Sequence, residues 1–556
     1  MKYPRPKNAL LSAVAMLAVA VTVASIRPAD SDDKTDPKHL KTATPIKHLV
    51  VIFNENRSFD HYFGTYPNAL NPEGEPVFEP AKNTQRDINN LLSSPALLDD
   101  NPNLNPLNGT SASNPFRLDR TQANTADQNH AYSAEEKAYD AGKNDLFPLD
   151  TGSGTKGGAG GFGTTAQVMG YFDGNTVTAF WNYAQNYAMS DNAWTDTFGP
   201  STPGAIHVFA GNTNGVVPGL GTSGSELPDG QGGFTLIGDV DPAGDVCSSK
   251  TTTVSSNAKN IGDLLNAANI PWGSFVGGFN LQTINNNGST GCTRSSVSSV
   301  IGAPITDYIP HHIWFQYFAS TANPTHARPT STKAIGFTEV PGTQKVDPAN
   351  HGYDLDDFTT AVGAGNFPAV SFIKMAAFQD GHPGNSDPLD EQTGLVTLIN
   401  FLQQQPDWNS TAVIVTYDDS DGWYDHAFSP TTSGSFSAAD FLNGTGNCGI
   451  PGFTPEPNGL KGLPVAGRCG PGTRVPFLVI SPFAKKNFVS HTLISQASVP
   501  RFIEDNWLKG ERLGGGSFDA TTGSIMDMFN FNKAKETTLI LDPTFGTVDT
   551  KKSKGL

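Results

Sequence analysis

The chain has 556 residues, a length that accommodates about three domains of ordinary size, and its formal net charge is −17. Only 16% of its residues are charged, whereas glycine and proline are frequent, at 58 and 40 residues. The acidic balance excludes nucleic acid as an electrostatic partner, because no cluster of lysine or arginine interrupts it. The composition predicts a modest number of regular elements joined by long loops.

The N-terminus predicts a signal peptide. Three basic residues among the first seven precede an apolar stretch from Ala9 to Ile26 that ends in small residues. This order is typical of secretory signals, so we expect residues 1–29 to be removed and the mature protein to be periplasmic or secreted. The alternative is an uncleaved anchor, since the apolar stretch approaches the roughly 20 residues that span a bilayer. No later stretch is apolar for long enough to span a membrane.

The first predicted core element is a buried strand at residues 46–53, and the polar residues Glu55 and Asn56 follow it directly. Residues 68–163 are rich in Asn, Pro, Gly and Ser. This composition predicts a long insertion in which only residues 133–136 have the pattern of a helix start.

The next elements predict a helix at 177–188 and, after a turn at 198–204, a further helix. Residues 214–345 contain two of the cysteines, glycine-rich loops and a helical pattern at 261–268. We interpret this range as an insertion that forms a cap over the core.

Core elements then return in alternation. Strand patterns at residues 369–374, 411–416 and 475–481 are accompanied by helical patterns at 392–404 and 499–508. Strands that alternate with helices predict an α/β fold, a three-layer α/β/α sandwich around a mainly parallel sheet. We expect a catalytic domain at 44–510 and a C-terminal tail at 511–556 that packs on or extends it.

Four cysteines fit an oxidising compartment. Their order suggests that Cys247 pairs with Cys292 and Cys448 with Cys469, although three connectivities are possible. A zinc site is the alternative, but the spacing of two residues typical of zinc-binding cysteine pairs is absent.

An acidic run follows the strand at 411–416. Asp418 and Asp419 come first, at the carboxyl end of the strand, where open α/β sheets bind ligands. Adjacent carboxylates repel each other unless a metal or a proton offsets the charge. Together with Glu55 and Asn56 they offer the hard oxygen donors that divalent cations prefer. The alternatives are an acidic turn for the aspartates and a solvated loop or N-cap for Glu55 and Asn56.

Residues 54–64 read Asn-Glu-Asn-Arg-Ser-Phe-Asp-His-Tyr-Phe-Gly, very close to a signature of the bacterial phosphoesterase family, which includes phospholipases C and acid phosphatases. Further blocks resemble this family in the same order, at residues 198–204, 311–318, 381–383 and 417–426. The resemblance spans nearly all of 46–508 and implies a fold similar to alkaline phosphatase.

The resemblance implies that Ser201 is a nucleophile that forms a phosphoenzyme, with Thr202 as the alternative register. It implies a single divalent metal bound by Glu55, Asn56, Ser201, Asp418 and Asp419. The ligands leave the identity of this metal open among Ca²⁺, Mg²⁺, Mn²⁺ and Zn²⁺.

The resemblance also implies histidines around the phosphoryl group and the leaving group. The candidates are His130, His382 and His312, with His311 as the alternative to His312. Four further residues are expected to support the ligands from behind: Asp60, His61, Asp425 and His426.

The expected function is a metal-dependent phosphoric ester hydrolase, an exported acid phosphatase that works through phosphoserine. The form of residues 418–423 resembles the acid phosphatase branch, and only about 48 residues follow Leu508. The alternative is a phospholipase C that cleaves the headgroup phosphodiester of phosphatidylcholine-type lipids. A binding protein without catalysis is a more remote alternative. The oligomeric state stays open.

Overall fold

The computed structural model describes residues 36–154, 161–221, 223–532, 534 and 537–555. The expected signal peptide, residues 1–29, lies outside them. Within this part of the chain, no helix is long and apolar enough to cross a membrane.

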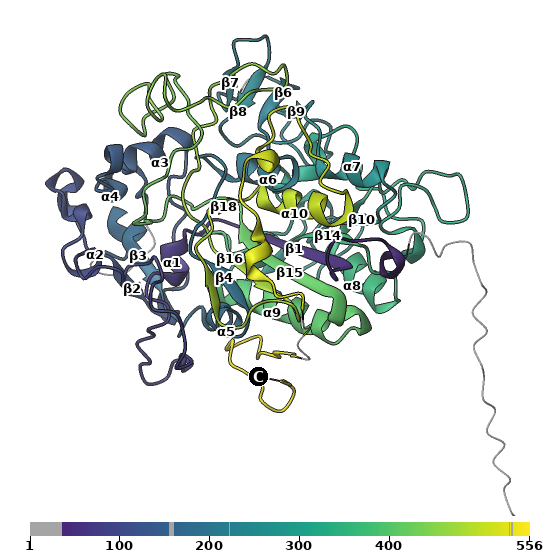
Figure 1. The fold of residues 1–556 in the computed structure, drawn as a ribbon, viewed down its shortest axis with the longest axis horizontal. Coiled ribbons are helices and arrows are strands. Elements are labelled where there is room, and N and C mark those ends of the chain that lie inside the picture. Colours follow the sequence, from purple (N-terminus) through teal and green to yellow (C-terminus); the bar gives the residue numbers. More distant parts are fainter. Residues whose placement is uncertain (1–35, 155–160, 222, 533, 535–536, 556) are drawn as a thin grey trace, which may run out of the picture.

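An eight-stranded sheet forms the centre of the molecule (Figure 1). In spatial order its strands are β13 (Gly352–Asp354), β10 (Trp272–Val276), β14 (Val370–Lys374), β1 (His48–Asn54), β15 (Thr411–Tyr417), β16 (Phe477–Ile480), β4 (Ala188–Ser190) and β17 (Phe488–Ser490). The five strands from β13 to β15 are mutually parallel. Strand β16 is antiparallel to both of its neighbours, and β17 is parallel to β4. The predicted mainly parallel sheet is confirmed.

Strands β1 and β15 lie side by side at the centre of the sheet. Every residue of both is buried, in keeping with their continuous apolar sequences. Their register pairs His48 with Thr411 and Asn54 with Tyr417. The residues that follow the two strands therefore emerge together at the same edge.

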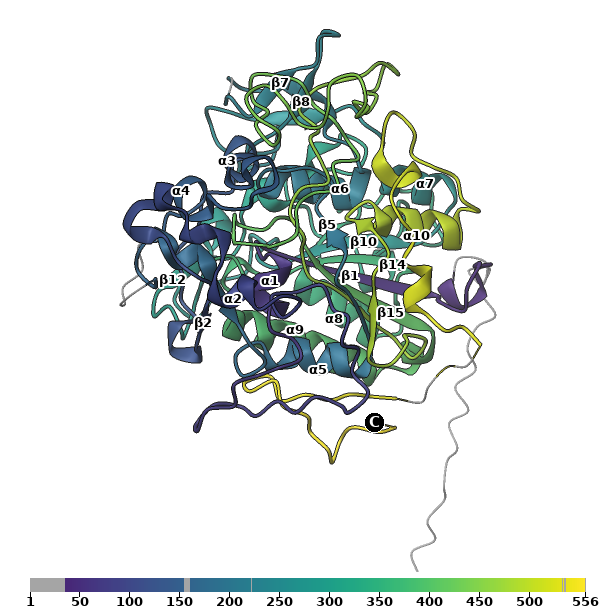
Figure 2. The same ribbon diagram turned by 60° about the vertical axis from the view of Figure 1, so that its left-hand side comes forward.

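Helices cover both faces of the sheet (Figures 1 and 2). One layer contains α6 (Ser201–Ala210), α7 (Ile261–Ala267) and α10 (Ser498–Trp507). The other contains α5 (Thr178–Asn186), α8 (Leu355–Gly363) and α9 (Pro388–Gln403). The three-layer α/β/α sandwich is therefore present.

The range 214–345 is not one insertion. Its first part forms a separate four-stranded sheet, β7 (Glu226–Pro228), β8 (Phe234–Leu236), β6 (Asn214–Pro218) and β9 (Val254–Ser256). Its later part supplies α7 and β10 to the core and also contains a hairpin, β11 (Ser295–Val297) and β12 (Pro304–Thr306). The strand pattern of β10 is weak because its five residues include Gly273 and Ser274.

The remaining short elements lie in the connections. They are α1 (Phe59–Phe63), α2 (Ala96–Asp99), β2 (Phe116–Leu118), α3 (Tyr132–Ala138), α4 (Phe147–Asp150), β3 (Gly170–Phe172), β5 (Ala193–Trp194) and β18 (Ile494–Ser495). Both expected disulfides, Cys247–Cys292 and Cys448–Cys469, are formed. In the C-terminal tail, Leu539 and Leu541 are buried, and the carbonyl of Leu539 accepts a hydrogen bond from Gln403 on α9.

Candidate active site

The candidate site lies where β1, β14 and β15 end. Glu55 and Asn56 follow β1, and Asp418 and Asp419 follow β15; all four are buried. The backbone N–H of Asn56 donates to Asp418 Oδ1 over 3.2 Å, which ties the two strand ends together. Asn56 has a left-handed backbone (φ 56°), a conformation that asparagine tolerates better than most residues and that often occurs at functional sites.

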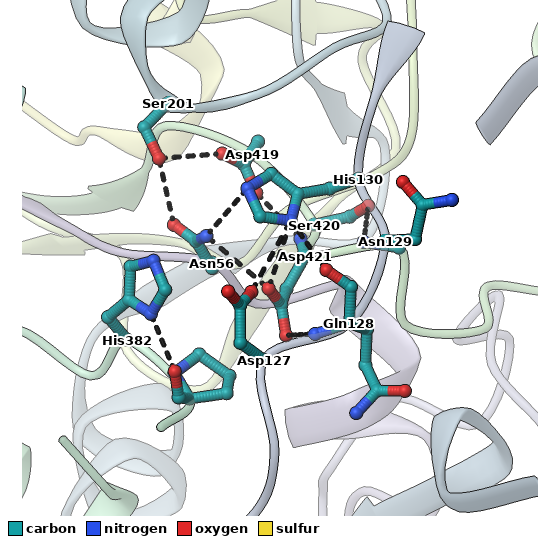
Figure 3. Close-up of polar contacts among 12 residues, drawn as sticks. Asn56, Asp127, Gln128, Asn129, His130, Ser201, His382, Asp419, Ser420 and Asp421 are labelled. Carbon is teal, nitrogen blue, oxygen red and sulfur yellow. Dashed lines mark hydrogen bonds and ion pairs between the residues drawn. The ribbon is translucent and has the colours of Figure 1, made fainter. Parts of the chain in front are cut away.

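Ser201 is the first residue of α6 and directs its hydroxyl at this cluster (Figure 3). Its Oγ lies 3.0 Å from Glu55 Oε2 and 3.1 Å from Asp419 Oδ2. Gly204 explains how the helix comes so close, because a Cβ there would lie 2.1 Å from the carbonyl oxygen of Asp418. The hydroxyl has one proton and faces several acceptors, so it cannot satisfy them all.

Thr202, the alternative nucleophile, points elsewhere. Its hydroxyl lies 3.0 Å from Asp239 Oδ1 and 3.1 Å from the carbonyl oxygen of His311, and its backbone N–H also donates to Asp239. Of the two candidate hydroxyls, that of Ser201 is therefore the one held against the strand-end carboxylates.

The strand-end oxygens fit a divalent cation. The amide end of Asn56 that carries Oδ1 lies 2.7 Å from Glu55 Oε2 and 3.1 Å from Asp418 Oδ1, so acceptors face each other unless the amide turns over. Asp418 Oδ2 is buried and has no hydrogen-bond partner in the described part of the chain. Burial and neighbouring carboxylates raise the pKa of Asp418 well above its usual range. Carboxylate, amide and hydroxyl oxygens at such spacing are the donors that a hard cation takes.

Lys374, at the end of β14, is part of the site, although the sequence analysis does not predict it as a site residue. Its ammonium group forms an ion pair with Glu55 Oε1, and His312 Nδ1 lies 3.0 Å from the same oxygen. The two carboxylate oxygens of Glu55 thus have different partners: Oε1 contacts Lys374 and His312, and Oε2 contacts the Ser201 hydroxyl. Burial lowers the pKa of Lys374, but the surrounding carboxylates outweigh it and the net pKa is raised. The available signal was its position at the end of a predicted strand.

Three predicted histidines surround the cluster. His130 Nδ1 lies 2.9 Å from the carbonyl oxygen of Gln128 and 3.2 Å from Asp421 Oδ1. Ligand-type atoms of Glu55, His312 and His382 all lie within 4.8 Å of one another. Figure 3 shows His130 and His382 on either side of Asn56.

His311, the alternative to His312, faces away. Its Nδ1 lies 3.4 Å from Asp241, and its side chain is 31% exposed.

The pKa values of His130 and His312 are shifted in opposite directions. Burial lowers the pKa of His130, but Asp419 and Asp421 outweigh it and hold the pKa well above its usual value. Burial instead dominates at His312 and lowers its pKa to about 3.

A cavity of about 450 Å³ adjoins the site. His130, Pro200 and Asp239 are among the residues that line it. Because Pro200 precedes the candidate nucleophile, a substituent of the substrate in this cavity would lie beside the reacting hydroxyl.

Three of the four residues expected to support the ligands, Asp60, Asp425 and His426, instead form a second cluster. Asp60 Oδ2 lies 2.5 Å from His426 Nδ1, and Arg474 Nε donates to Asp425 Oδ1 over 2.8 Å. His61 stacks on Trp423 at 3.9 Å between ring centroids. The expectation that they orient the ligands directly is wrong, because the side chains of Asp60, Asp425 and His426 bind Arg474 and one another. The His61 side chain lies against Arg57 and the carbonyl oxygen of Gly170. Asp421, in the same acidic run, lies on the other side, towards the candidate site, and contacts His130 Nδ1 over 3.2 Å.

A serine hydroxyl held against carboxylates at the strand ends of an α/β sheet is typical of hydrolases. A protein-family model described as the phosphoesterase family matches residues 46–508. The chain therefore belongs to the phosphoesterase family.

Several relatives of this chain are phospholipases C. The non-hemolytic phospholipase C of Pseudomonas aeruginosa is 24% identical over 492 residues, which cover 87% of this chain and 57% of the relative. Phospholipase C A of Mycobacterium tuberculosis is 24% identical over 468 residues, covering 81% of this chain and 70% of the relative. The chain thus spans little more than half the length of the Pseudomonas relative.

Among solved structures, a protein of the alkaline phosphatase superfamily from Vibrio parahaemolyticus gives a TM-score of 0.27 at 12% identity, covering 80% of this chain and 82% of that chain. An alkaline phosphatase variant gives 0.31 at 11% identity, covering 63% and 94%. At these TM-scores the structural similarity is weak, and the fold is defined by the sheet order itself.

Proposed function

We propose that this protein is an exported, metal-dependent phospholipase C that works through a covalent phosphoserine. The observation that carries the proposal is the Ser201 hydroxyl, buried against Glu55 and Asp419 at the strand ends. The comparisons favour phospholipase C over the acid phosphatase expected from the sequence, because the named relatives are phospholipases C. The two disulfides fit an exported protein.

In the proposed reaction, Ser201 Oγ attacks phosphorus, the new Oγ–P bond forms, and the bond from phosphorus to the glyceride oxygen breaks. The serine proton passes to a carboxylate oxygen within 3.1 Å, on Glu55 or Asp419. Ser201 begins α6, so the positive end of the helix dipole lies beside the developing charge. A divalent cation bound by Glu55, Asn56, Asp418 and Asp419 would lower the pKa of the hydroxyl and offset phosphoryl charge.

The histidines complete the reaction. His130, whose charged form Asp421 and Asp419 stabilise, is placed to offset charge on the phosphoryl oxygens. His382 presents a second imidazole whose Nδ1 lies 2.7 Å from the carbonyl oxygen of Pro383, which leaves Nε2 to protonate the departing alkoxide. Water then attacks the phosphoserine, releases the phosphorylated headgroup and returns the proton to Ser201.

The test compares substrates and two neighbouring variants. The wild-type protein, assayed with Mn²⁺, Zn²⁺ or Ca²⁺, should hydrolyse p-nitrophenyl phosphorylcholine and phosphatidylcholine faster than p-nitrophenyl phosphate. Ser201→Ala should abolish turnover, by about 10⁴-fold or more. Thr202→Val, the matched control, should retain most of it. Near-normal turnover by Ser201→Ala would contradict the mechanism. Faster hydrolysis of p-nitrophenyl phosphate than of the two phosphodiesters would favour an acid phosphatase over a phospholipase C.

A further inference from the structure

A long segment beside the candidate site carries almost no charge. Residues 427–455, which we call the uncharged loop, contain a single charged residue, Asp440. Asp440 is buried and accepts hydrogen bonds from the hydroxyls of Tyr132 and Ser435, at 2.7 and 2.8 Å. The surface of this loop is therefore free of charged side chains, although the chain as a whole carries a net charge of −17.

Two large apolar side chains project from the loop into solvent. Phe453 is 86% exposed, the largest value for a large apolar side chain in the described part of the chain, and Ile450 is 62% exposed. They lie in one turn, where the N–H of Phe453 donates to the carbonyl of Ile450 over 3.0 Å. Exposed apolar side chains that gather at one place mark surfaces that bind a partner or a membrane.

The loop holds these side chains outward by its own internal bonds. Cys448, two residues before Ile450, is joined to Cys469 by a disulfide. Cys448 also exchanges two backbone hydrogen bonds with Ser435, at 2.9 and 3.1 Å. The turn is thus preorganised, and docking through it would cost little conformational entropy.

The same loop packs against walls of the cavity beside Ser201. The hydroxyl of Tyr132, a lining residue, donates to Asp440 and accepts from the N–H of Cys469 over 3.0 Å. The segment that follows the loop runs beside β7 and β8, where Gln231 donates to the carbonyl oxygens of Leu463 and Pro464; it is light green in Figures 1 and 2.

We propose that the uncharged loop docks this protein on a zwitterionic phospholipid surface, with Ile450 and Phe453 inserted among the lipids. This inference rests on the proposed function and extends it to the partner surface. A protein partner would need about 800 Å² on each side for a specific interface, whereas two side chains at the tip of a turn suit insertion into a lipid surface. The net charge of −17 opposes binding to anionic lipid, so neutral headgroups are favoured.

The test separates docking from catalysis. In a Ser201→Ala background, which prevents lipid hydrolysis, co-sedimentation with phosphatidylcholine vesicles is compared with and without Ile450→Ser and Phe453→Ser together. The double variant should partition at least tenfold more weakly. With Ser201 intact, it should hydrolyse phosphatidylcholine vesicles at least tenfold more slowly and soluble p-nitrophenyl phosphorylcholine at the wild-type rate.

The matched control is Phe545→Ser. Phe545 is 51% exposed. The carbonyl oxygens of its neighbours accept hydrogen bonds from α9 and α5, Thr544 from Gln392 and Gly546 from Asn182, so it lies by the helix layer that contains α5, α8 and α9. This variant should bind vesicles normally. Unchanged vesicle binding in the double variant, an equal loss on the soluble substrate, or tighter binding to anionic vesicles overturns the inference. If the protein binds vesicles through the loop but cleaves no phosphodiester, the proposed function is refuted and the docking inference stands.

Discussion

Two buried acidic clusters arise from the same two segments of the chain and are neutralised in different ways. In the first, Glu55 and Asp418 follow β1 and β15, and in the second, Asp60 and Asp425 lie five to seven residues further along. Arg474 bonds both carboxylates of the second cluster, at 2.8 Å to Asp425 and 3.5 Å to Asp60. The first has Lys374, which reaches Glu55, while Asp418 Oδ2 has no hydrogen-bond partner among the described residues.

The pKa directions follow the cation that each carboxylate meets and not the cluster as a whole. Burial raises the pKa of Glu55, but His312 and Lys374 outweigh it and the net pKa is lowered, whereas at Asp425 burial outweighs Arg474 and the net pKa is raised. Burial raises the pKa of Asp60, but His426 and Arg474 outweigh it and the net pKa is lowered. At Asp418, burial and neighbouring carboxylates together raise the pKa well above its usual range. Buried carboxylates need a compensating cation. Arg474 contacts both carboxylates of the second cluster, whereas Lys374 pairs with Glu55 and leaves Asp418 available to the proposed metal.

The largest expected effect is on the second cluster. Arg474→Met should leave Asp60 and Asp425 without their cation and lower the free energy of unfolding by about 3–5 kcal/mol. Urea titration of the purified protein measures this loss. Arg501→Met removes the partly exposed ion pair to Asp505 at 3.9 Å and should cost only about 0–1 kcal/mol. Equal losses in the two variants would show that Arg474 does not neutralise a buried cluster.

A smaller effect is expected from the lysine of the other cluster. Lys374→Met keeps the length of the side chain but releases Glu55 Oε1, so Glu55 is held less firmly and turnover should fall about 10–100-fold. The rate with p-nitrophenyl phosphorylcholine measures it. Lys47→Met is the control, because Lys47 precedes β1 at the opposite end of the strand and should leave turnover unchanged. A wild-type rate for Lys374→Met would mean that the metal alone orients Glu55.

The central strands and the residues after them could be predicted because their sequences are long and apolar. The seven buried residues of β1 and of β15 stand out from their loops, and the polar residues that follow must emerge at one edge of a parallel sheet. Strands β4, β13 and β17 have three residues each, too few for a periodic pattern to show.

The partition of the acidic residues into two clusters could not be predicted, because it depends on distant partners. Arg474 is 414 positions from Asp60, and Lys374 is 319 positions from Glu55. Periodicity reports which face of an element is buried but not which cation meets which carboxylate. Residues 418–426 therefore read as one acidic run, although the fold divides its aspartates between a candidate metal site and an ion-pair cluster.

The most direct test of this division is the divalent metal content of the purified protein and two matched variants, measured by elemental analysis after dialysis. Asp418→Asn and Asp425→Asn each remove one buried carboxylate charge from the same run. The wild-type protein should retain a single divalent ion, Asp425→Asn should retain it too, and Asp418→Asn should lose it. Metal retained by Asp418→Asn but lost by Asp425→Asn, or a wild-type protein that binds no divalent ion, would contradict the account.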